Sequence, residues 1–350
     1  MLTRDVAIRK ARATMGTSLE ELVEAATLTG DPEQPPLVFV DLDALHDVSD
    51  IDLATACDAL TRPTVVTVGE ATRPVPDLLT PLLDALTTTL APAGPGRAWV
   101  SADAGAAERI RQTVTAAPTA ALTMANLLPA TARADVADGL LLESLAYSKL
   151  LAGEEFAAWR ARTQHRAAAP SDDLVLLDRD EDTLTITLNR PERHNAYSTA
   201  MRDALIEGLE LARLDPSITE VRLRGAGPSY CAGGDLAEFG TASPAAAHLV
   251  RLARSAGRLV HELRDRVTVD VHGACIGAGV EIPSFAGRVN ARPDAFFQLP
   301  ELAMGLIPGA GGTVSLTARI GRWRTAYLAL TADRIPADTA LAWGLVDAIV

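Results

Sequence analysis

Two glutamates and two clusters of glycine carry the chemistry that this sequence could perform. Glu281 follows the glycine-rich run GACIGAGV, and Glu301 stands inside the apolar run QLPELAMGL. Two carboxylates that face one substrate can divide general acid–base catalysis, because one can activate a water molecule while the other protonates carbon. An isolated glutamate is usually a solvated surface residue, and at a helix start it also interacts favourably with the helix dipole. The apolar surroundings of Glu301 are what favour a chemical role.

The glycine clusters supply backbone amides. The pattern predicts a buried strand at 267–271, a tight turn at 273–279 and a helix that begins near 280. The first amides of a helix have no partner within the helix, so they can hold a developing negative charge. The second cluster, CAGGD at 231–235, is expected to open a helix in the same way. The alternative is that these glycines only make tight turns.

Composition narrows the classes of function. The chain has 350 residues, 48% of them apolar, and a formal net charge of −13, which argues against a nucleic-acid surface. No apolar run reaches membrane-spanning length and the N-terminus lacks a signal-peptide pattern, so we expect a cytoplasmic protein with no membrane partner. The three cysteines and six histidines show no metal-ligand spacing, and no metal site is predicted. The glycine loops also lack the third glycine or the lysine of nucleotide-binding motifs.

The first half reads as a mixture of strands and helices. Short strands are predicted at 37–42, 64–68 and 98–101, and helices at 18–28, 53–60 and 77–90. From 104 to 162 the pattern is wholly helical, and one apolar stripe in it is expected to face the core: Leu141, Leu145, Leu150, Phe156 and Trp159. The polar joint at 165–173 is the predicted domain boundary, which gives domains at 1–165 and 174–350.

The second half repeats strand, turn and helix. A hairpin is predicted from 174–177 and 183–188, followed by the loop RPERHNAYS. A helix at 199–214, a strand at 221–224 and a helix at 248–263 lead to the stretch that contains Glu281. This order indicates a layered α/β fold with parallel strands and short crossovers.

Five motifs in this half resemble those of one family. They occur in the order RPERHNAYS, YCAGGDLAEF, HGACIGAGVEI, FFQLPELAMGLIPGAGGT and LTADRIPADTALAWGLVDAIV. On these motifs residues 174–350 resemble the crotonase (enoyl-CoA hydratase/isomerase) superfamily. The resemblance implies an α/β fold of the ClpP/crotonase type, a layered ββα spiral, here preceded by a smaller α/β and helical N-terminal domain.

The resemblance also implies roles for the residues. The amides of Gly234 and Ala278 would form an oxyanion hole for the thioester carbonyl; the family most often has glycine at the second position, but alanine still supplies an N–H. Glu301 would exchange the proton at the α-carbon, and Glu281 would orient and activate water. Segments that hold coenzyme A in the family correspond to residues of two loops in this chain: Arg193, Ala196, Ala232, Asp235 and Leu236.

The activity implied is hydration of a 2-enoyl-CoA, a lyase reaction. The substrate would be an acyl-CoA thioester, no cofactor is implied beyond the coenzyme A of that thioester, and a homo-oligomer (trimer or hexamer) is expected. The alternatives within the family are a double-bond isomerase, which can work with one glutamate, and a 3-hydroxyacyl-CoA hydrolase; the family also contains decarboxylases and cofactor-independent oxygenases. An alternative from another class is a non-catalytic partner that binds acyl-CoA or acyl-carrier protein.

The N-terminal half could complete this site. Family members normally continue past the last motif into a helical tail that covers the site, whereas this sequence stops at Val350. The helical stretch at 104–162 resembles such a tail. We therefore expect a degenerate crotonase-like N-terminal half whose closing helices cap the site, which would remove apolar surface from water.

Overall fold

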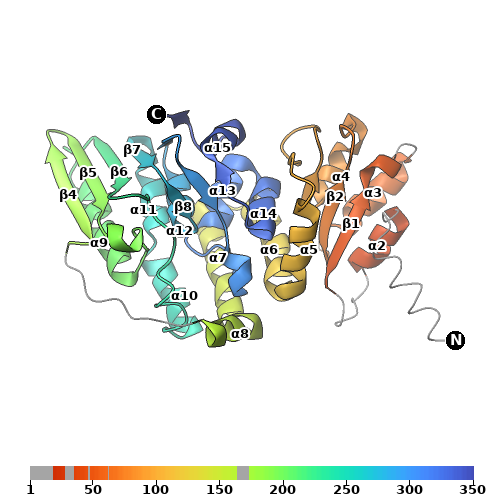
Figure 1. Ribbon diagram of the computed structural model, residues 1–350, viewed down its shortest axis with the longest axis horizontal. Helices are drawn as coiled ribbons and strands as arrows, with labels where there is room; N and C mark the ends of the chain where they lie inside the picture. The colour runs from red at the N-terminus through yellow and green to blue at the C-terminus, as the bar shows by residue number, and fades with distance from the viewer. Residues whose placement is uncertain (1–18, 28–34, 46–47, 62, 164–172) are drawn as a thin grey trace. The chain divides into compact units, whose positions relative to one another are not determined.

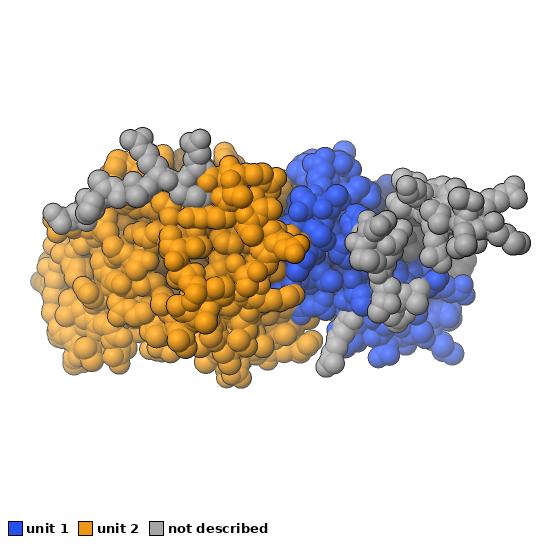
Figure 2. Space-filling model, turned by 90° about the horizontal axis from the view of Figure 1, so that it is seen from below, with its two compact units in different colours: residues 1–126 blue, residues 127–350 orange. Residues whose placement is uncertain are grey.

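The computed structural model describes residues 19–27, 35–45, 48–61, 63–163 and 173–350. The chain forms two compact units, residues 1–126 and 127–350 (Figure 2). The helices between 127 and 162 therefore belong to the same unit as the second half. The predicted joint at 165–173 lies almost wholly outside the described residues.

Unit 1 contains a parallel three-stranded sheet in the order β1-β2-β3, in which Leu37 pairs with Val66 and Val68 with Thr88. Its strands are β1 (Leu37–Asp41), β2 (Val66–Glu70) and β3 (Thr88–Leu90). Its helices are α2 (Leu19–Thr27), α3 (Asp50–Ala59), α4 (Thr80–Ala85), α5 (Ala106–Ala116) and most of α6 (Pro118–Thr131), with short 3-10 turns η1 (Leu42–Ala44) and η2 (Asp77–Leu79).

Two predictions for this unit were wrong. The helix predicted at 77–90 ends at Ala85, and its last residues form β3. Consecutive β-branched threonines favour the extended chain, and the Thr87 amide donates to the hydroxyl of Thr67 on the neighbouring strand. The strand predicted at 98–101 is reduced to a single bridge between Val100 and Leu90.

Unit 2 is built on a six-stranded sheet in the order β12-β9-β7-β6-β5-β4. Figure 1 labels strands β4 to β7 of this sheet. Only β4 runs antiparallel to its neighbour, because it forms the predicted hairpin with β5. A smaller sheet, in the order β11-β10-β8, accompanies it. The strands are β4 (Val175–Asp180), β5 (Thr183–Leu188), β6 (Glu220–Gly225), β7 (Val267–Val271), β8 (Ala274–Ile276), β9 (Arg288–Ala291), β10 (Phe296–Gln298), β11 (Ile335–Pro336) and β12 (Ala348–Ile349).

The chain passes repeatedly from the large sheet to the small one and then into helical structure. Strand β7 leads to β8 and then to a helical turn, and β9 leads to β10 and then to another. After β6 the chain makes the same passage through a bridge between Cys231 and Cys275. Each passage ends in a turn beside the small sheet, so the turns at 231–235, 277–281 and 298–301 gather in one place.

The helices of unit 2 pack on these sheets. They are α7 (Val136–Leu151), α8 (Glu154–Arg162), α9 (Thr199–Leu214), α10 (Pro244–Ala253), α11 (Ala256–Glu262), α12 (Ala278–Glu281), α13 (Gly312–Ile320), α14 (Arg322–Thr331) and α15 (Ala337–Trp343), with 3-10 turns η3 (Pro191–Arg193), η4 (Arg264–Arg266), η5 (Pro283–Phe285) and η6 (Glu301–Met304). Helix α9 has the predicted bounds, and Gly208 lets it lie close to Leu177 and Ile186 of the β4–β5 hairpin.

Three helix predictions need correction. The helix predicted at 248–263 is two helices, because Ser255 caps the start of α11. The helix expected from 280 is one α-helical turn, α12, followed by the 3-10 turn η5 that begins at Pro283, which has no amide hydrogen to continue the α pattern. The CAGGD turn does not open a helix: hydrogen-bonded turns occupy 236–240, and α10 begins only at Pro244.

Helices α7 and α8 pack against helical segments of the second half. Helix α7 packs against α10 and α13, and α8 packs against η6, which begins with Glu301. The predicted apolar stripe on α7 was wrong in part: Leu141 and Leu145 are 38% and 51% exposed. The buried face of α7 instead includes Gly139 and Glu143.

Candidate active site

Glu281 and Glu301 lie together beside Gly277. Glu281 ends the short helix α12 and Glu301 begins η6 after strand β10, and both are buried, at 2% and 7% exposure. A methyl group placed on Gly277 would be 2.5 Å from Oε1 of Glu301 and 3.8 Å from Oε1 of Glu281. Both carboxylates therefore face the same small volume at this turn.

The carboxylate of Glu281 is fixed on one side by backbone amides. Its Oε2 accepts hydrogen bonds from the amides of Ala310 and Gly312, at 2.7 and 2.8 Å. Gly312 has to be glycine here, because a methyl group on it would be 2.7 Å from Cγ of Glu281. Oε1 is thus the oxygen of Glu281 that remains for chemistry.

Glu301 has the opposite environment. Its Oε2 is buried and, within the described part of the chain, has no hydrogen-bond partner. A buried carboxylate oxygen without a partner is costly and is therefore uncommon in folded proteins. Such an atom is suited to meet a ligand or a reacting proton.

Burial and the charges of neighbouring acids raise the pKa of both carboxyls. Burial is the main cause that raises the pKa of Glu281 well above its ordinary value, and the charges of Glu301 and Glu143 add to it; the amides of Ala310 and Gly312 act against the shift. Burial likewise raises the pKa of Glu301 to about 8. Two neighbouring carboxyls that cannot both ionise easily hold a proton between them at neutral pH.

The two glycine-rich turns run against each other. The Ile276 amide donates to the carbonyl of Cys231 at 3.0 Å, and a methyl group on Gly279 would overlap that same carbonyl. Within the described residues, the amides of Gly234 and Ala278 donate to no protein acceptor. Two unused donors therefore lie on adjacent turns.

The turn at 231–235 is held by the loop that precedes α9. The Tyr197 amide donates to the carbonyl of Gly233, and the Asp235 amide donates to the carbonyl of Tyr197. Asn195 is fully buried: its Oδ1 accepts from the Arg190 amide, and its Nδ2 donates to three carbonyls, those of Ala226, Ser229 and Tyr230. This side chain locks the loop to the segment between β6 and the turn.

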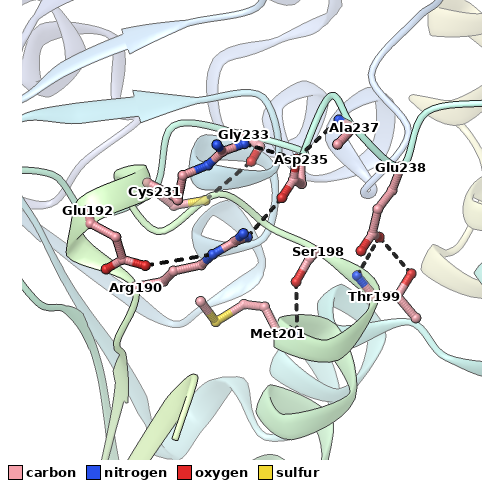
Figure 3. Close-up of polar contacts among 11 residues, drawn as sticks. Arg190, Glu192, Ser198, Thr199, Met201, Cys231, Gly233, Asp235, Ala237 and Glu238 are labelled. Carbon is pink, nitrogen blue, oxygen red and sulfur yellow. Dashed lines mark hydrogen bonds and ion pairs between the residues drawn. The ribbon is translucent and has the colours of Figure 1, made fainter. Parts of the chain in front are cut away.

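A buried ion pair lies behind Gly234. Arg190 and Asp235, whose side chains are 5% and 4% exposed, are joined at 2.8 Å between Nη1 and Oδ2 (Figure 3). Burial alone would raise the pKa of Asp235, but the hydrogen bonds from Arg190 and the Ala237 amide, with the charges of Arg190 and Arg193, hold it below its ordinary value. The Asp235 carboxylate is thus occupied by protein groups, which favours a structural role over direct contact with a ligand.

The other residues expected near coenzyme A occupy the same two loops. Arg193 is 40% exposed and lies 3.6 Å from Asp235, and Leu236 is 47% exposed. The Ala232 amide donates to the carbonyl of His194 and the Ala196 amide to that of Arg193. The structure therefore brings all five residues together, with Arg193 and Leu236 open to solvent.

Other kinds of site find no support in the described residues. Among them, no group of three or more His, Cys, Asp or Glu side chains is placed to hold a metal ion. No helix in the described ranges is both long enough and apolar enough to cross a membrane.

Three residues that shape this site were not predicted from the sequence. Arg190 and Asn195 lie inside the motif RPERHNAYS, so the motif could have directed attention to them. Glu143, on α7, accepts hydrogen bonds from the amides of Gly311 and Thr313 and is 2% exposed. Only its position as a charged residue within an apolar helix could have indicated it.

Comparison with known proteins gives consistent relationships for the second half. A family model described as enoyl-CoA hydratase/isomerase matches residues 178–350. The 1,2-epoxyphenylacetyl-CoA isomerase of Escherichia coli is 32% identical over 183 residues, which are 51% of this chain and 70% of that protein. The 2,3-dehydroadipyl-CoA hydratase of E. coli is 33% identical over 49% of this chain and 67% of its own length.

A further relative and a solved structure match the same half. The mitochondrial enoyl-CoA hydratase of Pongo abelii is 32% identical, and the match spans 47% of this chain and 56% of that protein. The crystal structure of an enoyl-CoA hydratase from Thermoplasma volcanium aligns with 51% of this chain and 71% of its own, at 32% identity and a TM-score of 0.48.

Proposed function

The chain belongs to the enoyl-CoA hydratase/isomerase family, and from that premise we propose that it is an enzyme that adds water across the double bond of a 2-enoyl-CoA thioester. The observation that carries this proposal is the pair of buried carboxylates at Gly277, one tied by two amides and the other with an unpartnered oxygen. This asymmetry suits two different roles in one proton-transfer reaction.

In the proposed reaction the amides of Gly234 and Ala278 hold the thioester oxygen as it becomes negative. Their lack of protein acceptors in the described part of the chain and the contact between their turns support this role. The oxygen of water bonds to the β-carbon, its proton passes to Glu281, and the proton of Glu301 passes to the α-carbon. The double bond becomes a single bond, and no other reactant is required.

The assignment of roles follows from the hydrogen bonds. Burial raises the pKa of both carboxyls, but only Glu281 accepts hydrogen bonds from two backbone amides that favour its charged form, so Glu281 is the better base of the pair. Glu301, whose pKa is about 8, retains its proton at neutral pH and is the better acid.

Isomerisation of the double bond is the second candidate. Because Oε2 of Glu281 is occupied, Glu301 is the carboxyl with a free oxygen, and an isomerase needs only one group to remove a proton and return it. Hydrolysis of a 3-hydroxyacyl-CoA releases a free thiol, and binding without catalysis gives no product. An assay of products therefore separates both from hydration and isomerisation.

The test is incubation of the full chain with crotonyl-CoA and with longer and aromatic 2-enoyl-CoA thioesters, and separately with a 3-enoyl-CoA and a 3-hydroxyacyl-CoA. Hydration removes the absorbance of the conjugated thioester, isomerisation of a 3-enoyl-CoA creates it, and hydrolysis releases a free thiol. Glu301→Gln should lower kcat by about 10³-fold or more, because it removes the acid that transfers the proton. Glu207→Gln, at an exposed position on α9, is the control. Unchanged turnover in Glu301→Gln would end this mechanism.

A further inference from the structure

Four successive amides at the start of α13 are shared alternately between two buried glutamates. Those of Ala310 and Gly312 donate to Glu281, and those of Gly311 and Thr313 donate to Glu143, all between 2.7 and 2.9 Å. Alternate amides therefore point to opposite sides of the turn. Glu281 binds one side of it and Glu143 binds the other.

Both carboxylate oxygens of Glu143 accept hydrogen bonds from the turn at 311–313. Its Oε1 accepts from the Gly311 amide, and its Oε2 accepts from both the amide and the hydroxyl of Thr313, at 2.9 and 2.7 Å. Gly311 has φ +104°, a conformation that glycine adopts without steric cost but that its flexible backbone does not hold by itself. The carboxylate of Glu143 supplies three hydrogen bonds to that turn.

Helix α7 holds Glu143 against the turn through contacts on both sides of this residue. One face of the helix follows the turn: Gly139 lies against Val314, and Tyr147 lies against Gly309. Each of these residues is four positions from Glu143, which places all three on one side of the helix.

The adjacent side of α7 is fixed to α10. The hydroxyl of Ser144 lies 2.9 Å from Nδ1 of His248, and the hydroxyl of Ser148 donates to the carbonyl of Pro244. Arg251 of α10 donates to the carbonyl of Ser144 and lies over the ring of Tyr147.

We propose that Glu143 is a positioning residue for Glu281: by holding the amides of Gly311 and Thr313 it fixes the turn in the conformation in which Ala310 and Gly312 bind Oε2 of Glu281 and leave Oε1 free. This inference rests on the proposed function for its kinetic consequence. Its structural consequence, a turn that depends on the Glu143 carboxylate, does not.

The charge of Glu143 also reaches the catalytic pair. Glu143 faces Arg251 from α10, Tyr147 on its own helix, and the two acids Glu281 and Glu301. Its charge is among the causes that raise the pKa of Glu301, so removing it should lower that pKa. If Glu301 is the acid, the alkaline limb of the kcat profile should then move to lower pH.

The test compares Glu143→Gln with wild type in the full chain. The amide group of glutamine brings a donor against amide donors, so we expect kcat to fall about 10- to 100-fold with KM within about threefold, and the alkaline limb to shift to lower pH. Thr313→Val, which removes one of the three hydrogen bonds, should give a smaller loss of the same kind. Asp138→Asn, exposed on the same helix, should match wild type.

The outcomes separate the two proposals. If wild type turns over no enoyl-CoA, the proposed function fails, and amide hydrogen exchange at 310–313 then tests Glu143 alone: Glu143→Gln should exchange at least tenfold faster there than wild type. Exchange equal to wild type, or kcat and pH profile both unchanged in an active enzyme, would overturn the role of Glu143. If Glu143→Gln does not fold, amide hydrogen exchange at 310–313 and the kcat profile of Thr313→Val test the role of Glu143 in its place.

Discussion

Gly277→Ala is the substitution that most directly perturbs the pair of acids. Gly277 has φ +51° and ψ −121°, a region that side-chain-bearing residues scarcely occupy, and the added methyl group would lie 2.5 Å from Oε1 of Glu301. The backbone strain should cost about 1–3 kcal/mol of unfolding free energy. Relief of the overlap would move the Glu301 carboxylate by roughly 1 Å, which should lower kcat about 100-fold or more.

Gly344→Ala separates strain from displacement. Gly344 also has positive φ, +80°, but a methyl group there would meet only the carbonyl of Arg319 at 3.8 Å. We expect it to cost about 1 kcal/mol and to leave kcat unchanged. Urea denaturation followed by circular dichroism, with enoyl-CoA hydration measured on the same samples, gives both quantities. If Gly277→Ala kept kcat within threefold and unfolded like Gly344→Ala, the placement of Glu301 at this turn would be refuted.

Two further predictions concern charge. Asp235→Asn should destabilise the protein by about 3–5 kcal/mol, because it leaves the buried Arg190 with only the exposed carboxylate of Glu192, 3.9 Å away. Asp203→Asn at a half-exposed ion pair should cost under about 1 kcal/mol, and equal urea midpoints would contradict this. Glu143 has a pKa raised to about 7, so its contribution to stability is complete below its unfolded value and is lost as pH rises through 7. This loss is on the order of 3 kcal/mol between pH 4.5 and 7. Thermal unfolding between pH 4 and 8 should show a decline that is smaller by about this amount in Glu143→Gln than in wild type, because the raised pKa values of Glu281 and Glu301 still contribute in the variant.

The local sequence pattern predicted the bounds of an element correctly where the burial of apolar residues determines its structure. Helix α9 and strand β5 have the predicted bounds because each carries its apolar residues at the period of its own geometry. The burial of Glu281 and Glu301 side by side also agrees with the expectation from the motifs. Their catalytic roles, like the oxyanion roles of Gly234 and Ala278, stay predictions.

The spacing of apolar residues did not predict the buried face of a helix where that face carries polar or small residues. On α7 the leucines suggested one buried face, but Gly139 and Glu143 face the interior because the 309–314 segment offers amides and close backbone there. No count of apolar residues can reveal a surface that is satisfied by hydrogen bonds. The helix prediction at 77–90 was wrong at β3 for a related reason, because the extended form of these threonines depends on pairing with β2.

The order of the parts along the chain has a consequence for synthesis. Glu143 and the amide of Gly311 are 168 residues apart, with the glutamate made first. At the usual 5–20 residues per second, roughly 10–30 s pass on the ribosome before its partner exists. During that interval α7 emerges with a carboxylate in water and nothing to bind it. Closure of the site therefore has to wait for the synthesis of residues 310–313, and its rate should depend on how quickly two segments 168 residues apart are brought together.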